Sequence, residues 1–587
     1  MLSFLKYVLA TIVGLMLFII LALFIVGGIA ATAGGETVEV KDGSVLRLKL
    51  DKPLLERAPE DPFEGLNVPL FAQQEGIGLY DLRRTLRNAA VDDRIRGLYL
   101  DVAVVQGGYA QIEELRNDLM EFKESGKFIV TYGEFYTEGA YLLASVADEI
   151  MLNPEGVMEF NGLYVEPTFI KGTLEKLGVV PYVIRAGTYK SAGETFTEKE
   201  LSPNNREQIT SFITSIYERY LSLVSEGRGK TPAQLRAVAE EGGLPFPDEA
   251  ARKGLITKVG YYDEMLTLLR ERLELEADEE VEFIAYERYR KAAPVQVVSK
   301  SQNRVAVLFA SGNIVSGEGS ETVIGADQIA RELRKLRDDD RVKAVVLRIN
   351  SGGGSAIASD VMWRAIQLTR EEKPVIASMS TVAASGGYYM AMACDTIVAQ
   401  PTTLTGSIGV FSLLFNAQEL LNEKLGVTTG MVKTAPFADL GLPTSELTDA
   451  ERAILQRRTD AVYETFLTKV ARGRDLPLDS VRTLAEGRVW TGQEAIDRGL
   501  VDVLGGLDDA VALAAAAAGL DEDDYRIRPL PEQKNFLEQL TDEGEEQYRM
   551  WAMERRFGIW APLVQQIEEI GEMQGPQARI PFDFEVR

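Results

Sequence analysis

The chain contains the same sequence pattern twice, and this repeat constrains the fold more than any other feature. Residues 92–100 recur as residues 339–347, and residues 139–150 recur as residues 386–397, both at a spacing of 247 residues. Weaker matches at spacings of 245 to 248 residues continue as far as residues 499–501. So steady a spacing over a long stretch indicates a tandem duplication of one domain.

Each copy has the pattern of an α/β domain. Apolar stretches typical of strands occur at residues 45–50, 95–102 and 128–132. Between them, residues 72–87 and 112–125 place apolar side chains at the three- and four-residue spacing of a helix. Strands that alternate with helices predict a largely parallel sheet, so we expect two α/β repeats in succession.

The repeat also sets the expected domain boundaries. A charged stretch without a long apolar run separates the copies, and the acidic residues after the second copy have no counterpart in the first. We therefore predict an N-terminal membrane anchor (1–35), a first repeat (36–270), a junction (271–303), a second repeat (304–530) and a C-terminal helical extension (531–587).

The N-terminus has the composition of a membrane span. The stretch from Tyr7 to Ala33 carries no charged side chain. It is longer than the ~20 residues needed to cross a bilayer, and it is also longer than the apolar core of a secretory signal peptide. Lys6, before the span, favours an N-in orientation. We expect a single-pass anchor in a bacterial inner membrane, with the rest of the chain on the periplasmic side.

The residue types that are absent narrow the chemistry. The chain has no histidine, which excludes Ser-His-Asp and Cys-His catalysis and histidine-ligated zinc. Cys394 is the single cysteine, so we expect a small buried core residue and no metal or other cofactor. A net charge of -26 argues against a nucleic-acid partner. A serine enzyme with this composition needs another base, and lysine is the known substitute.

One small-residue turn is a candidate for such a serine. An apolar strand at residues 374–380 leads into Thr381–Gly387, and a helix is expected from Tyr388. Ser385 would then lie at a helix N-terminus, where negative charge is favoured, and Ala383-x-Ser385-x-Gly387 approximates a nucleophile elbow. The alternative is that Ser385 only caps the helix.

The two copies differ in a complementary way at this turn and at a loop further along the chain. Ser385 aligns with Glu138 in the first copy, whereas Lys190 of the first copy aligns with Ala438 in the second. Such a distribution suggests one site to which each half contributes one group. The alternative is that Lys190 is an ordinary surface lysine. To act as a base near pH 7 its pKa must fall by about 3 units, roughly 4 kcal/mol, which requires burial.

A glycine-rich loop offers oxyanion donors. Residues 345–354 end in three glycines before a helix expected at residues 356–369. The N–H of Gly353 or Gly354, together with that of Gly386, could bind an oxyanion, worth ~3 kcal/mol per donor. Alternatively, the glycines form only a loop that enters the helix.

Taken together, these motifs resemble the signal peptide peptidase A family of protease IV enzymes, in the long tandem-domain form. The resemblance rests on residues 187–192 (GTYKSA), 348–354 (RINSGGG), 383–388 (AASGGY) and 404–409 (LTGSIG). It implies a crotonase/Clp-protease-like fold, a membrane anchor and a homotetramer. It also implies Ser385 as nucleophile, Lys190 as general base and Ser407 as hydrogen-bond partner of the lysine. The family usually has proline where this chain has Gly352.

The expected function is therefore a membrane-anchored serine endopeptidase with a Ser/Lys dyad that degrades apolar peptides such as cleaved signal peptides. Whether the dyad forms within one chain or between chains stays open at this point. One alternative is a crotonase-like enzyme that acts on acyl-CoA, although CoA is scarce outside the cytoplasm. The other is a non-catalytic membrane scaffold.

Overall fold

The computed structural model describes residues 6–7, 11, 13–17, 38–58 and 76–580, apart from residues 244, 293, 296–298, 321, 522–523 and 533–574. Within these ranges, no helix is both long and apolar enough to cross a membrane. Most of the predicted anchor lies outside the described residues, as does most of the helical extension predicted at residues 531–587. Within that extension, residues 577–579 form a strand and not a helix.

The first repeat is built on a parallel sheet of six strands in the order β8-β6-β5-β4-β1-β9. Its central strands are almost completely buried, as expected of a parallel sheet covered on both faces. The strands are β1 (Ser44–Lys49), β4 (Ile95–Asp101), β5 (Phe128–Tyr136), β6 (Glu149–Met158), β8 (Lys258–Val259) and β9 (Phe283–Ala285).

The second repeat has the same strand order, β20-β16-β15-β13-β10-β21, with every one of these pairs parallel. The predicted duplication is therefore confirmed in the topology. These strands are β10 (Arg304–Ser311), β13 (Val342–Ser351), β15 (Val375–Ala384), β16 (Thr396–Ala399), β20 (Val503–Leu504) and β21 (Arg526–Leu530). Two further strands extend this sheet beside β15: β17 (Leu404–Gly406) and β19 (Val489–Thr491).

Helices cover the sheets as the sequence pattern predicts. Leu79, Leu82 and Leu86 of α2 (Leu79–Val91) are buried at helical spacing, and this helix begins later than the predicted residue 72. Cys394 is buried, as expected. The other helices that pack near the two main sheets are α3 (Tyr109–Glu124), α4 (Glu138–Ala144), α9 (Pro247–Arg252), α10 (Tyr262–Leu273), α11 (Tyr286–Tyr289), α12 (Ala326–Asp338), α13 (Ala356–Arg370), α14 (Gly386–Ala391), α17 (Gly492–Ile496) and α18 (Leu507–Ala517).

The predicted junction is partly folded into the first repeat. β9 lies within residues 271–303 and pairs with β1 in the register Val45 to Phe283. A strand of three residues is too short to give an alternating pattern, so the charged sequence around it reads as a linker. Its counterpart β21 lies on the other sheet, next to β10.

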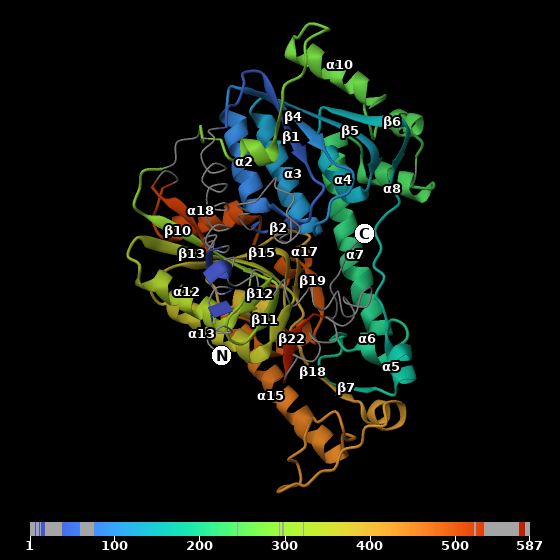
Figure 1. Cartoon of the computed structure of the whole chain (residues 1–587), viewed down its shortest axis with the longest axis vertical. Helices are drawn as coiled ribbons and strands as arrows, with labels where there is room; N and C mark the ends of the chain where they lie inside the picture. Colours follow the sequence, from blue (N-terminus) through green and yellow to red (C-terminus); the bar gives the residue numbers. More distant parts are fainter. Residues whose placement is uncertain are drawn as a thin grey trace.

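A third, mixed sheet joins the repeats, in the order β12-β11-β14-β22-β18-β7. The strand β7 (Val180–Ala186) comes from the first repeat and pairs antiparallel with β18 (Val410–Asn416) of the second. The remaining strands are β11 (Asn313–Val315), β12 (Val323–Gly325), β14 (Gly353–Ser355) and β22 (Gln577–Arg579), the last from the C-terminal segment. Figure 1 shows this sheet below the first repeat, close to β15 and β19.

Long helices connect the layers. The helix α7 (Pro203–Arg228) extends from the first repeat toward the third sheet (Figure 1), and its Ser211 and Ser215 bond to Glu494 and Thr491. The remaining elements are β2 (Leu54–Leu55), β3 (Ile77–Gly78), α5 (Lys171–Leu177), α6 (Glu194–Thr197), α8 (Pro232–Glu240), η2 (Leu420–Lys424), α15 (Asp449–Gly473) and α16 (Leu478–Leu484).

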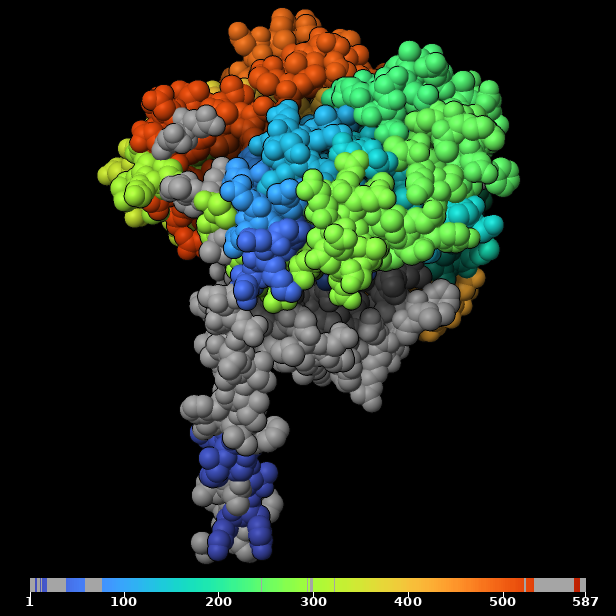
Figure 2. Space-filling view, turned by 90° about the horizontal axis from the view of Figure 1, so that it is seen from above, coloured from blue at the N-terminus to red at the C-terminus, as the bar shows by residue number. Residues whose placement is uncertain are grey.

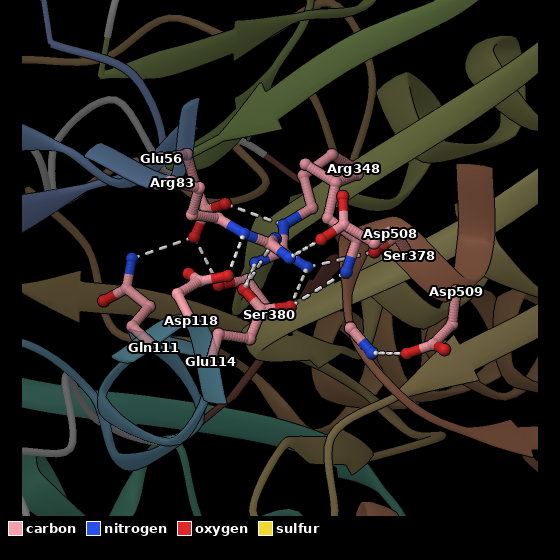
Figure 3. Close-up of polar contacts among 12 residues, drawn as sticks. Glu56, Arg83, Gln111, Glu114, Asp118, Arg348, Ser378, Ser380, Asp508 and Asp509 are labelled. Carbon is pink, nitrogen blue, oxygen red and sulfur yellow. Dashed lines mark hydrogen bonds and ion pairs between the residues drawn. The ribbon is translucent and has the colours of Figure 1, made fainter. Parts of the chain in front are cut away.

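Buried charges hold the two repeats together. Arg348 of β13 is completely buried and donates to Glu56 (2.7 Å), to Glu114 of α3 (3.1 Å) and to the Ser378 hydroxyl (3.0 Å). Arg83 of α2 lies in the same cluster, where it bonds to Asp118 at 3.1 Å. Figure 3 shows these side chains converging between the repeats. A buried charge needs compensating partners, so this cluster favours one relative placement of the repeats.

Candidate active site

Ser385 lies at the bend between β15 and α14, as predicted. Its backbone has φ 54° and ψ −109°, a strained combination for a residue with a side chain. The Ser385 N–H donates to the Gly406 carbonyl at 2.8 Å, which holds the bend against β17. Its side chain makes no capping hydrogen bond to α14. The capping alternative is therefore wrong, because the hydroxyl is directed to another partner.

That partner is Lys190, which follows β7. The strand β7 pairs with β18 along its whole length, from Val180 opposite Asn416 to Ala186 opposite Val410. This pairing places the loop that follows β7 against the second repeat. The Tyr189 N–H then donates to the Glu486 carbonyl at 2.7 Å. Gly487 leaves room for the loop, since a Cβ there would lie 2.6 Å from the Lys190 Cβ.

The lysine amine contacts two serines. Lys190 Nζ lies 2.8 Å from Ser385 Oγ, 3.0 Å from Ser407 Oγ and 3.1 Å from the Ser407 carbonyl oxygen. All three residues are completely buried. The structure thus brings together the three side chains that the sequence singled out, and the contact forms within one chain.

Burial lowers the pKa of Lys190 well below its ordinary value, and desolvation is the sole cause. No carboxylate among the described residues offsets this effect, so the neutral amine is favoured. The alternative of a solvent-exposed surface lysine is therefore wrong. A neutral amine beside a serine hydroxyl can accept the hydroxyl proton, which is the chemistry of an activated nucleophile.

The glycines expected to bind an oxyanion lie beside this pair. A Cβ on Gly353, whose φ is +101°, would lie only 2.7 Å from the Gly386 nitrogen, so these two glycines are close. The Gly353 N–H already donates to Ser351 Oγ at 3.1 Å. Of the two amides considered in the glycine loop, that of Gly354 is therefore the better candidate to act with Gly386.

The first repeat has a carboxylate at the corresponding bend. Glu138 is buried and accepts hydrogen bonds from the N–H groups of Asn161 (2.8 Å) and Gly162 (2.6 Å). Burial raises its pKa to about 7. Thr137, just before it, caps α4 by accepting from the Ala140 N–H. The bend in this copy therefore has a different polar arrangement, as the alignment with Ser385 indicated.

Sequence reasoning missed two contributors to the site. Gly487 makes room for Lys190, but an isolated glycine in a loop gives no signal of what passes it. The strand β22 lies against the glycine loop, with Ala578 in register with Gly354. Three residues without a distinctive pattern could not be recognised as part of this sheet.

The chain is similar in sequence to known proteins. The profile of "Peptidase family S49" matches residues 121–276 and 367–521, one match in each repeat. The chain belongs to peptidase family S49. This S49 peptidase is 33% identical over 515 residues to "Protease 4" of Haemophilus influenzae, covering 83% of this chain and 82% of that protein. It is 35% identical over 464 residues to "Protease 4" of Salmonella typhi, covering 77% and 74%.

A plant relative extends the comparison. The S49 peptidase is 36% identical over 487 residues to "Serine protease SPPA, chloroplastic" of Arabidopsis thaliana, covering 82% of this chain and 70% of that protein. The predicted resemblance to the protease IV family is thus confirmed, together with two α/β domains of the Clp-protease/crotonase-like type. The chain is a serine peptidase rather than an acyl-CoA enzyme or a non-catalytic scaffold.

Proposed function

We propose that this S49 peptidase hydrolyses apolar peptides with Ser385 as the nucleophile and Lys190 as the general base. The observation that carries the proposal is the 2.8 Å contact between Lys190 Nζ and Ser385 Oγ. Ser407 accepts from the same nitrogen and fixes its position. Gly386 and the loop of Gly353 and Gly354 supply the oxyanion site.

The reaction follows from these positions. Neutral Lys190 takes the Ser385 proton as Oγ attacks the peptide carbonyl carbon, and the carbonyl oxygen becomes an oxyanion beside the glycine amides. The Lys190 ammonium then gives its proton to the departing amine as the C–N bond breaks. Water attacks the resulting ester with Lys190 again as base, and Ser385 is regenerated with a free carboxylic acid as product.

The surroundings favour apolar substrates. Ala192, Phe411 and Leu413 form an apolar cluster next to the loop that carries Lys190. Burial of apolar side chains of a peptide in such surroundings is favourable by about 25 cal/mol per Å². The proposed substrates are therefore apolar peptides such as cleaved signal peptides, which would be encountered at a membrane.

Membrane anchoring is part of the proposal. The described residues near the N-terminus include highly exposed apolar side chains, at Tyr7 (74%), Leu15 (61%) and Leu17 (62%). Figure 2 shows these N-terminal residues, in dark blue, apart from the folded body. Such side chains are expected to be covered by lipid. We propose that the N-terminal segment spans a bacterial inner membrane once with its N-terminus on the cytoplasmic side, that the peptidase lies on the periplasmic side, and that the chain forms a homotetramer.

The test uses full-length protein in detergent and a synthetic signal peptide, with products identified by mass spectrometry. Ser385→Ala and Lys190→Ala should each reduce hydrolysis at least 10³-fold, as expected for members of a catalytic unit. The matched controls are Ser320→Ala and Lys199→Ala, both on exposed side chains, which should keep wild-type rates. Retention of activity in either dyad variant would show that the proposed dyad is wrong.

A further inference from the structure

A buried glutamine anchors residues 187–193, the lysine loop that carries Lys190. This residue, Gln208 of α7, is 1% exposed. Its Nε2 donates to the Tyr189 carbonyl at 3.1 Å and to Ser191 Oγ at 2.9 Å. One amide group therefore holds both residues that flank the lysine.

The other end of the same amide reaches the second repeat. Gln208 Oε1 accepts from the Val489 N–H of β19 at 3.3 Å, and α7 packs against this strand (Figure 1). The residue before it, Arg488, accepts from the Ser407 N–H at 2.7 Å through its carbonyl. Gln208 thus bonds the lysine loop to the chain segment that holds Ser407.

The place of the amine depends on how these two segments are held. Lys190 Nζ contacts the hydroxyl of Ser407 at 3.0 Å and its carbonyl at 3.1 Å, and the same nitrogen lies 2.8 Å from Ser385 Oγ. A lysine side chain is a flexible four-carbon stem. Its nitrogen stays at these distances only if the backbone that carries it is fixed.

A buried polar network holds Gln208 in one orientation. Ser191 Oγ donates to Asn205 Oδ1 at 3.0 Å, and Asn205 Nδ2 donates to Glu194 Oε2 at 3.0 Å. All four side chains are buried. Because a buried polar group left unpaired is costly, rotation of the Gln208 amide away from these partners is unfavourable.

This network has no charge effect on Lys190. Desolvation is the sole cause of the lowered pKa of its amine. The charged side chains near the lysine loop that leave this pKa unchanged are Arg185, Glu194, Glu207, Glu486 and Arg488. An amide is uncharged, so loss of Gln208 raises the pKa of Lys190 only by letting water reach the amine.

We propose that Gln208 is a positioning residue, which sets the place of the Lys190 amine by joining the lysine loop to β19. The inference rests on the proposed function and adds to it the side chain that aligns the base. Without this bridge the loop loosens from the second repeat, Nζ loses its fixed distance to Ser385 Oγ, and water reaches the amine. Proton transfer from Ser385 then becomes slower.

The test uses Gln208→Met, which keeps the length of the side chain and removes its amide, in full-length protein in detergent with a synthetic apolar peptide. The kcat should fall about 10- to 100-fold, because a small misplacement of a catalytic group is costly. The KM should not change, because the buried Gln208 is not open to the peptide. The acid limb of the kcat/KM profile should move to higher pH, since an amine reached by water regains a higher pKa and is protonated earlier as the pH falls.

The pH profile separates positioning from mere destabilisation. A partly unfolded variant would lose kcat without moving the acid limb, because the molecules that stay folded keep a buried amine. Ser191→Ala is the second variant, in case Gln208→Met does not fold by circular dichroism. It removes one acceptor of Gln208 and leaves the bond to the Tyr189 carbonyl, so it should give a smaller shift in the same direction.

The matched control is Gln456→Met on α15. Gln456 is half-buried and donates to the Arg185 carbonyl at 3.1 Å, ahead of the lysine loop. The same substitution therefore removes a bond of the same kind and should keep the wild-type kcat and pH profile. An equal shift in this control, or an unmoved acid limb in Gln208→Met and Ser191→Ala, would overturn the positioning role.

Ser385→Ala and Lys190→Ala are measured alongside these variants. If both are inactive while Gln208→Met matches wild type, the positioning role alone is overturned. If either dyad variant stays active, the proposed function fails, and the positioning role fails with it.

Discussion

Arg348 offers a test of how the two repeats are held together. Its guanidinium is completely buried and is bonded to two carboxylates of the first repeat, Glu56 and Glu114. Burial alone would raise the pKa of Glu114, but the charges of Arg348 and Arg83 hold it below the ordinary value. In Arg348→Ala, the guanidinium left near Glu114 is that of Arg83, whose Nη1 lies 3.9 Å away, while the Leu507 N–H still donates to Glu114 at 2.9 Å. Removing one partner of a buried ion pair costs about 3–5 kcal/mol.

The assay is urea unfolding followed by fluorescence, with peptide hydrolysis measured at each urea concentration. The matched control is Arg341→Ala, which removes an exposed, solvent-screened ion pair with Asp339 and should leave the free energy of unfolding nearly unchanged. We expect Arg348→Ala to lose hydrolysis at a lower urea concentration than the control, because the dyad requires both repeats. If the two variants had equal unfolding free energies, the argument that this cluster joins the repeats would be refuted.

Three further predictions concern the site itself. Hydrolysis should fall as the pH falls through the lowered pKa of Lys190, because the protonated amine cannot accept the Ser385 proton; a kcat/KM that rises as the pH is lowered would contradict this. Ser407→Ala should lower kcat about 10-fold, the equivalent of one lost hydrogen bond, and an unchanged kcat would argue against its role in positioning the amine. Gly353→Ala should abolish hydrolysis while circular dichroism stays unchanged, since its φ of +101° and its 2.7 Å approach to the Gly386 nitrogen exclude a side chain; an active variant would exclude this loop from the oxyanion site.

Much of this arrangement was predictable from the sequence. The spacing of 247 residues predicted the duplicated sheets, because each repeat buries the same apolar strands. The complementary differences between the copies, at the bend of Ser385 and at the loop of Lys190, predicted the contact between these two residues. When a single site takes one residue from each copy, each copy can lose the residue that the other supplies, and this difference between the copies is visible in the sequence.

The rest depended on contacts that leave no local pattern. The pairing of β7 with β18 joins segments more than 200 residues apart, and nothing in either strand specifies its partner. The choice between Gly353 and Gly354 depends on where each N–H points, which follows from φ and from the Ser351 hydroxyl. A strand as short as β22 is recognisable only beside the edges that it pairs with.

The division of the dyad between repeats has a consequence for biosynthesis. Lys190 and Ser385 are 195 residues apart, so at about 5–20 residues per second a ribosome needs roughly 10–40 s to proceed from one to the other. The first repeat emerges with a base but no nucleophile. The nascent chain acquires peptidase activity only after the second repeat has folded against β7. The order of synthesis therefore delays the activity.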